Sequence, residues 1–307
     1  MIRRLLARLI PGRKTHAPRI YGPADHPVRS DQVSRGARMV TEKLHEAGFR
    51  AFVVGGAVRD LLLGQTPKDF DIATDATPEQ VKPLFRRAYV IGRRFRLVHV
   101  HMGAEVLEVS TFRAAQTGDD ATDEHGRLLS DNVYGTQEGD AARRDFTINA
   151  QSEEIWDYVG GVTDIRARRL KLIGAPVTRF REDPVRMLRA VRLAAKGGLA
   201  IDPKTAAPIP KLASRIQNVP PARLFDEMQK LLLSGHATET LASLRAHGLS
   251  HGLLPLLDVL LEQPLGTKFI EVALAGTDTR VREGRPVSPA FLFATLLWHE
   301  VLQQWNG

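Results

Sequence analysis

The segment from Gly55 to Thr74, with the sequence GGAVRDLLLGQTPKDFDIAT, constrains the fold of this chain more than any other stretch. It begins where the apolar run FRAFVV of residues 49–54 ends, and that run has the pattern of a buried strand. Two glycines between a strand and a helical pattern let the backbone approach a phosphate, and the new helix points its free N–H groups at the anion. A double glycine alone equally predicts a tight turn, so its interpretation depends on the two aspartates that follow.

Asp69 and Asp71 are two positions apart in the stretch DFDIA, which alternates polar and apolar residues as a half-buried strand does. Their side chains therefore leave the same face of the strand, and Phe70 between them points into the core. Neighbouring carboxylates repel each other unless a cation lies between them, and a pair of Mg²⁺ ions is the usual solution when the substrate is a nucleotide. A lone D-x-D pattern is also common on a solvated strand edge.

Glu108 supplies a third carboxylate. It is the charged residue of the otherwise apolar stretch VLEVS, so its side chain is either exposed on the outer face of a strand or turned towards a metal. Spacing alone does not decide between these orientations. Three crowded acidic groups cost stability unless a metal neutralises them, and this favours a metal site.

Cationic residues accompany these carboxylates. Arg59 lies in the first turn after the glycines, within reach of the same anion. The later stretch RRDFTINA (143–150) places Arg144 and Asp145 ahead of an apolar-alternating segment. Both stretches are candidates for binding a phosphorylated ligand.

The stretch REDPVRMLRAVR (181–192) predicts a helix with Asp183 as its N-cap and Pro184 as its first helical residue. An aspartate and an arginine at a helix start can match the donor and acceptor edge of a base, because Arg offers a fixed fork and Asp accepts. A solvated basic stripe is the plainer interpretation, above all for the last arginine of the series. The arginines recur at three-residue steps on one face: Arg186, Arg189 and Arg192.

A net charge of +8 and a sequence pI near 10.0 favour polyanionic partners, because Lys and Arg neutralise phosphates and release counterions. A basic surface without such a partner is the alternative.

The lack of cysteine excludes disulfides, zinc–cysteine sites and thiol catalysis, and it fits a reducing, cytoplasmic compartment. No run is long and apolar enough to span a bilayer, so we expect no stable membrane insertion.

The periodic segments predict an α/β head with a mixed sheet, followed by an all-helical neck and body. In the head we expect a helix from Ser30 to a stop at Gly48, a capping box at Thr77, and two strands joined by a turn at Gly103. Residues 114–139, rich in Gly, Asp and Thr, predict a mobile loop. The expected parts are a basic flexible arm (1–29), a catalytic head (30–175), a helical neck that binds nucleotide and RNA (176–235), and a helical body (236–307).

Together, GGAVRDLLLGQTPKDFDIAT, RRDFTINA and REDPVRMLRAVR resemble successive motifs of the class II nucleotidyltransferases, which are the bacterial poly(A) polymerases and the tRNA CCA-adding enzymes. The resemblance covers most of residues 30–300, and its long ordered series of motifs makes it specific. The stretches VIGRRFRLVHV (90–100) and PPARLFDEMQKLL (220–232) are similar to elements of the bacterial poly(A) polymerase branch, as is VREGRPVSPAFLFATLLW (281–298).

This resemblance implies a role for each candidate residue. The metal ligands would be Asp69 and Asp71, with Glu108 as the third catalytic carboxylate. The triphosphate would contact Gly55, Gly56 and Arg59. ATP would be held by Arg144, Asp145, Asp183, Arg186 and Arg189. A basic edge near the nucleotide or RNA would consist of Arg93, Arg94 and Arg96.

The implied reaction is attack of an RNA 3′-hydroxyl on the α-phosphate of ATP, with release of pyrophosphate, two Mg²⁺ ions and no template. RNA 3′ ends and ATP would be the ligands, and RNA-decay proteins further partners. A CCA-adding enzyme shares the head and accepts CTP as well as ATP. A non-catalytic RNA-binding scaffold with the same fold is the alternative of a different class.

Two features depart from the family pattern. Between Asn149 and Trp156 the chain has only AQSEEI, where relatives carry a longer strand pair. The chain ends at Gly307, whereas family members continue into a basic C-terminal region that contacts RNA. We therefore expect an apparently truncated helical body with a weaker grip on RNA, and an unchanged metal site.

Overall fold

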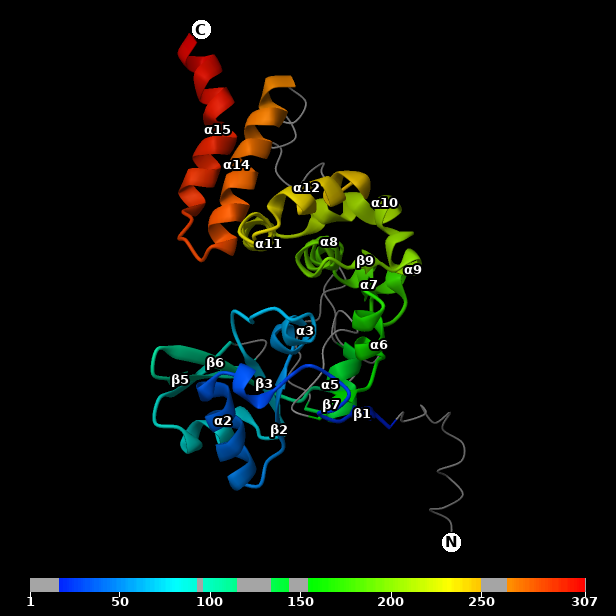
Figure 1. Cartoon of the computed structure of the whole chain (residues 1–307), viewed down its shortest axis with the longest axis vertical. Coiled ribbons are helices and arrows are strands. Elements are labelled where there is room, and N and C mark those ends of the chain that lie inside the picture. Colours follow the sequence, from blue (N-terminus) through cyan, green and yellow to red (C-terminus); the bar gives the residue numbers. More distant parts are fainter. Residues whose placement is uncertain (1–16, 93–95, 115–133, 144–153, 250–263, 307) are drawn as a thin grey trace. The chain divides into compact units, whose positions relative to one another are not determined.

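The computed structural model of the chain describes residues 17–92, 96–114, 134–143, 154–249 and 264–306. The chain forms two compact units, and the boundary in the described part falls between Thr163 and Asp164. The first unit holds the mixed sheet with its helices, and the second is helical, as the sequence predicts (Figure 1).

The first unit is built on a five-stranded sheet in which one parallel pair lies among antiparallel pairs. Strand β3 runs parallel to β6, and the other neighbours are antiparallel. The turn at Gly103, with φ +67°, joins β5 to β6 and confirms the predicted pair of strands. In spatial order the strands are β2 (Ala51–Val54), β3 (Asp71–Thr74), β6 (Glu105–Thr111), β5 (Leu97–Met102) and β4 (Ala88–Ile91).

One face of this sheet packs against helices and forms the main core. Ile72, Leu107 and Val109 are buried on that face, together with Val40 and Leu44 of the first long helix. The next helix begins at the glycine turn, and a short one carries the predicted capping box of Thr77 and Gln80. The helices and 3₁₀ turns here are η1 (Ser30–Gln32), α2 (Arg35–Glu46), α3 (Gly56–Leu62), α4 (Pro78–Val81) and η2 (Lys82–Leu84).

The N-cap of α2 is Ser34 and not Ser30 as the sequence predicts. The Ser34 hydroxyl accepts a hydrogen bond from the backbone N–H of Ala37 at 3.0 Å and donates one to Glu105 at 2.5 Å. Ser30 instead begins the short η1 turn. Ser34 is therefore the better N-cap, because its hydroxyl satisfies a helix N–H and also bonds to strand β6.

A second small sheet changes the prediction for the N-terminal segment. Strand β1 (Arg19–Tyr21), expected within a flexible arm, pairs antiparallel with β7 (Ile155–Asp157). Tyr21 is buried, and the Arg19 guanidinium lies 4.9 Å from the centre of its ring. The pairing partner lies more than a hundred residues away in sequence, which explains why local patterns miss it. Residues 1–16 lie outside the described part of the chain.

The last residues of the loop predicted at 114–139 are helical instead, because α5 (Gln137–Arg143) begins inside it. Residues 115–133 of that loop lie outside the described residues. Asp157 then fixes the turn after β7, since its carboxylate accepts hydrogen bonds from four successive backbone N–H groups between Val159 and Val162. Such a turn gives a buried carboxylate a complete set of partners.

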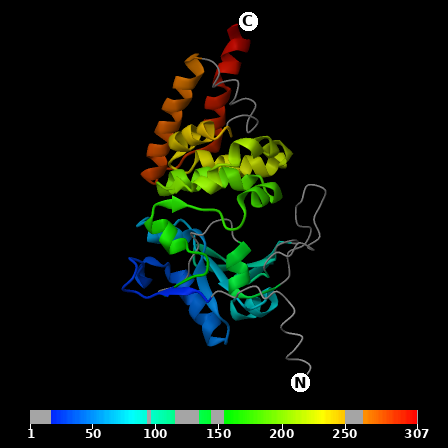
Figure 2. The same cartoon turned by 90° about the vertical axis from the view of Figure 1, so that its right-hand side faces the viewer.

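The described residues of the second unit are helical apart from one short parallel pair of strands, β8 (Arg169–Leu170) and β9 (Ala200–Ile201). Helix α8 is its central element and buries Met187, Leu188 and Val191. Helices α14 and α15 lie side by side (Figure 2). The helical elements of this unit, with α6 crossing the unit boundary, are α6 (Gly161–Arg166), α7 (Pro176–Glu182), α8 (Val185–Gly197), α9 (Pro203–Ala206), α10 (Ile209–Leu212), η3 (Ala213–Asn218), α11 (Pro221–Leu232), α12 (Ala237–Ala246), α14 (Pro264–Arg282) and α15 (Pro289–Asn306).

Helix α15 is rich in apolar residues and leaves Phe291, Trp298 and Trp305 exposed. Among the described helices, none is long and apolar enough to cross a membrane.

Candidate active site

The glycine turn of the first unit places a carboxylate beside the start of a helix. Gly55 has φ +75° and ψ −136°, a conformation that only glycine adopts readily. A Cβ atom at this position would lie 3.2 Å from Asp71 Oδ2, so a side chain would also crowd that carboxylate. Gly56 is the first residue of α3, where unpaired backbone N–H groups favour an anion. The turn and Asp71 therefore form one local site.

The sheet register brings two of the three predicted carboxylates next to each other. Asp71 is paired with Val54 on one side and with Glu108 on the other, so both acidic side chains leave the same face of the sheet. Asp69 is exposed and precedes the strand, which begins at Asp71 and not at Asp69. Phe70 is buried in the main core, as predicted. The carboxylates thus lie on the sheet face opposite the main core.

Glu108 contacts a histidine that the sequence analysis did not single out. His99 is the register partner of Glu108 on β5, and its Nε2 lies 3.4 Å from Glu108 Oε1. Within the described residues, no three His, Asp or Glu side chains converge in a geometry that would hold a metal. The donors that Asp69, Asp71 and Glu108 offer are all carboxylate oxygens, and these suit a hard cation such as Mg²⁺.

Arg59 folds back over the helix start. Its Nη2 lies 3.4 Å from the position that a Cβ atom on Gly56 would occupy, and the side chain is buried. Asp60 holds it there through a hydrogen bond to Nε of 2.7 Å and an ion pair to Nη2 of 2.5 Å. The structure therefore places Arg59 at the glycine turn, with a carboxylate partner that the sequence analysis missed.

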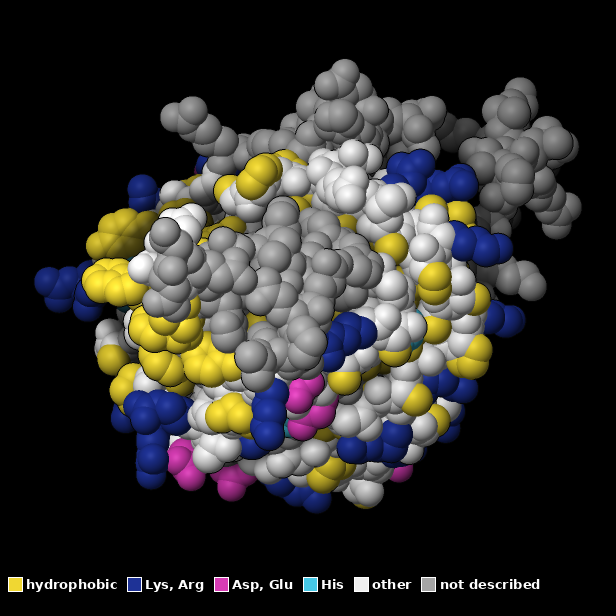
Figure 3. Space-filling view, turned by 90° about the horizontal axis from the view of Figure 1, so that it is seen from above, with side chains coloured by type: hydrophobic (Ala, Val, Ile, Leu, Met, Phe, Trp, Pro, Cys, Tyr) yellow, Lys and Arg dark blue, Asp and Glu magenta, His cyan; other side chains and the backbone are white. Residues whose placement is uncertain are grey.

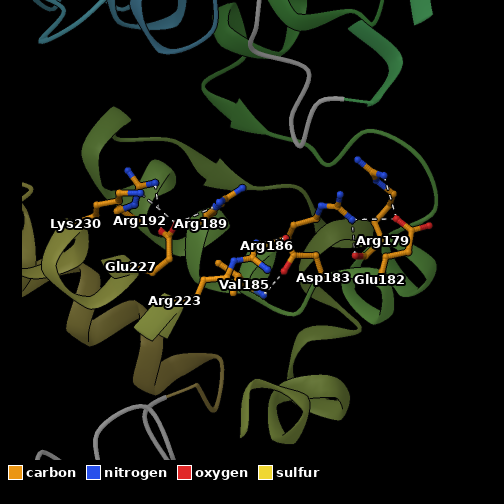
Figure 4. Close-up of polar contacts among 10 residues, drawn as sticks. All are labelled: Arg179, Glu182, Asp183, Val185, Arg186, Arg189, Arg192, Arg223, Glu227 and Lys230. Atoms are coloured by element: carbon orange, nitrogen blue, oxygen red, sulfur yellow. Dashed lines mark hydrogen bonds and ion pairs between the residues drawn. The ribbon is translucent and has the colours of Figure 1, made fainter. Parts of the chain in front are cut away.

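In the second unit, Asp183 and Arg186 flank the start of α8 (Figure 4). Arg186 Nη1 donates to the carbonyl oxygen of Arg179 at 2.9 Å and to Glu182 Oε2 at 3.0 Å, and its side chain is only 9% exposed. Asp183 Oδ1 accepts from the backbone N–H of Val185 at 3.2 Å. Its other oxygen, Oδ2, accepts from Arg223 Nη2 at 2.6 Å. The helix begins at Val185, one residue later than predicted.

The next arginines of α8 surround a buried glutamate of α11 (Figure 4). Glu227 has a side chain that is 3% exposed, and its Oε1 accepts from Arg189 Nε at 3.2 Å. Arg192 Nη2 and Lys230 Nζ lie 3.7 Å and 3.6 Å from its two oxygens. Arg192 therefore does not belong to a solvated stripe. Its place beside Met228 on the apolar side of α11 signals that Glu227 is buried, but not which residues pair with it.

The remaining candidates are separate from these clusters. Arg96 forms an ion pair with Glu79 of α4. Hydrogen bonds from its own backbone N–H and from Arg96 lower the pKa of the Glu79 carboxyl. Four candidates lie outside the described residues, namely Arg93, Arg94, Arg144 and Asp145. Most of the AQSEEI segment lies outside them as well.

Comparison with known proteins gives matches along most of the chain. Residues 51–171 match the family model described as the poly A polymerase head domain. Residues 198–261 match the model described as the probable RNA and SrmB-binding site of polymerase A. The chain is 47% identical over 293 residues to poly(A) polymerase I of Escherichia coli, and 47% identical over 287 residues to that of Haemophilus influenzae.

These alignments cover 91% and 88% of this chain but 63% of each relative, so the chain spans less than two thirds of the length of these proteins. Among solved structures, the CCA-adding enzyme of Bacillus stearothermophilus in complex with CTP superposes with a TM-score of 0.64 at 30% identity. That match covers 82% of this chain and 67% of the enzyme.

Proposed function

Because the chain belongs to the family of bacterial poly(A) polymerases and CCA-adding tRNA nucleotidyltransferases, we propose that it transfers AMP from ATP to RNA 3′ ends without a template. The reaction releases pyrophosphate and serves RNA polyadenylation and turnover. The observation that carries this proposal is the 47% identity to poly(A) polymerase I over 91% of the chain. The CCA-adding enzyme is the second candidate, because its solved structure superposes on 82% of the chain.

In this proposal the first unit binds the reacting phosphates. The glycine turn and the N–H groups at the start of α3 cradle the triphosphate, and Arg59 adds a positive charge beside it. Asp69 and Asp71 would hold two Mg²⁺ ions, with Glu108 as the third catalytic carboxylate, and the ions would supply charge neutralisation at the attacking and leaving oxygens. The remaining contribution of these residues is orientation, which suits a phosphoryl-type transfer that needs little covalent help.

The second unit recognises the nucleotide in the same proposal. Asp183 and Arg186 place a carboxylate and a planar fork of donors at one helix start, a combination that suits the edge of a base. The bonds of Arg186 Nη1 to the Arg179 carbonyl oxygen and to Glu182 hold this fork in one orientation. Arg189 adds a positive charge one turn later, and Arg144 and Asp145 complete the ATP-binding set. We assign residues 30–175 to catalysis, 176–235 to nucleotide and RNA binding, and 236–307 to the helical body.

The positive charge of the chain supports RNA as the acceptor. Lys and Arg side chains outnumber Asp and Glu on the face drawn in Figure 3, in keeping with the net charge of +8. Arg93, Arg94 and Arg96 are the residues that we propose for RNA contact. The cytoplasm, with RNA-decay proteins as further partners, is the proposed setting.

The proposed function is tested by extension of a short labelled RNA with Mg²⁺ and one nucleotide at a time. A long ladder with ATP alone is the expected result. Additions of one to three nucleotides that require CTP would instead assign the chain to the CCA-adding branch. No extension with any nucleotide would refute transfer by this chain.

Replacing Arg186 by alanine should weaken nucleotide selection more than RNA binding. A bidentate contact to a base contributes roughly 1–3 kcal/mol of discrimination, so the ratio of kcat/KM for ATP to that for CTP should fall about 5- to 150-fold. Primer extension and RNA-binding titrations on the same variant measure the two effects. Arg186→Lys, which keeps the charge but not the fork, should lose selection too.

Arg181 offers the matched control, because it is an exposed arginine at the end of the preceding helix α7. Arg181→Ala should leave nucleotide selection unchanged. Equal selectivity of Arg186→Ala and the unmodified chain would exclude Arg186 from base recognition.

A further inference from the structure

His99 occupies a row of residues that crosses the sheet at the candidate active site. Register pairs connect Val54 to Asp71, Asp71 to Glu108, and Glu108 to His99. Directly paired residues of neighbouring strands leave the same face of a sheet. The imidazole of His99 therefore stands on the face that carries the candidate carboxylates, next to Glu108 and one strand further from Asp71.

The contact between His99 and Glu108 is close without being a complete hydrogen bond. The atoms Nε2 and Oε1 are 3.4 Å apart, and Nε2 is buried with no hydrogen-bond partner among the described residues. A buried ring nitrogen without a partner is costly, whereas the half-exposed Glu108 side chain can rotate to close the distance. On the other side of His99, its register partner is Tyr89 of β4, whose ring packs edge-on against His101. On β6, the Ser110 hydroxyl donates to the Ile72 carbonyl oxygen.

We propose that His99 is a positioning residue, whose Nε2–H donates a hydrogen bond to Glu108 Oε1 and fixes the orientation of that carboxylate. With one oxygen held on the β5 side, the second oxygen of Glu108 is left on the side of β3 and Asp71. Repulsion between neighbouring carboxylates would otherwise turn Glu108 away. This inference rests on the proposed function, in which Glu108 is the third carboxylate of the site.

His101 provides a matched control on the same strand and the same face. In primer extension with ATP, His99→Ala should lower kcat about 10- to 100-fold, the usual effect of removing a group that orients a metal-binding side chain. Its KM for ATP should stay within about threefold of the unmodified chain, and half-maximal activity should need more Mg²⁺. His99→Gln, which can donate from a similar position, should restore much of the loss, and His101→Ala should have no effect.

A second measurement does not depend on activity or on Mg²⁺. In the metal-free protein, Glu108→Gln should shift the ¹⁵N signal of the His99 ring and leave that of His101 in place. An unchanged His99 signal, or a kcat for His99→Ala equal to that of the unmodified chain or of His101→Ala, would overturn the proposal. If the unmodified chain transfers no AMP, the proposed function fails, and the NMR result still decides whether His99 binds Glu108.

Discussion

Asp71→Asn should lower the rate of AMP transfer about 10³-fold or more while the fold remains intact. The substitution keeps the size of the side chain and removes its charge. Asp71 is the carboxylate that the structure places beside both the glycine turn and Glu108, where its charge would act on the bound phosphates and metal ions. Single-turnover primer extension measures the loss, and circular dichroism checks the fold.

Asp75 is a matched control, because it directly follows strand β3, at the opposite end from Asp71. Its carboxylate accepts from the backbone N–H of Arg50 at 2.8 Å and pairs with the guanidinium at 2.9 Å. Asp75→Asn removes the same charge and should cost at most about 1 kcal/mol of stability, because the pair is partly solvated. Full activity of Asp71→Asn, or equal losses in both variants, would refute the assignment of Asp71 to the metal site.

Local patterns in the sequence predicted the elements that build the candidate active site. The alternation of DFDIA placed Phe70 in the core, and the spacing of Thr77 and Gln80 predicted a capping box. Gly103 marked the turn between two strands. Each of these features depends on residues that are near neighbours in the chain, which is why periodicity and turn chemistry were sufficient.

Partners that come from distant parts of the chain could not be predicted in the same way. The orientation of Glu108 stayed open until the register of β5 and β6 identified His99 as its neighbour. The three-residue spacing on α8 predicted a shared face for its arginines but not that α11 would cover it with Glu227. Side-chain pairing of this kind depends on how elements pack, and a single sequence does not encode it in any local pattern.

The cluster around Glu227 should be a sensitive point of the second unit. Glu227→Ala should destabilise this unit by about 3 kcal/mol, near the lower end of the range for breaking a buried ion pair. The substitution removes the carboxylate that contacts Arg189 and Arg192, and both guanidinium groups are largely withdrawn from water. Lys230 adds little to the effect, because its side chain is 58% exposed and can turn into solvent.

Glu271→Ala is the control that isolates burial as the cause. Glu271 also pairs with an arginine of another helix, Arg245, at 3.9 Å, but both side chains are substantially exposed. This substitution should change stability by less than about 1 kcal/mol. Hydrogen exchange measures the two units separately. Glu227→Ala should reduce the protection of amides in α8 and α11 of the second unit, and it should leave the amides of β3 and β6 in the first unit unchanged. Equal protection of α8 and α11 in both variants would mean that Glu227 contributes no more than a surface ion pair.

Glu227→Ala should also weaken discrimination between ATP and CTP. Helix α8 carries Arg186 at its start, and a frayed helix no longer holds that guanidinium in one place.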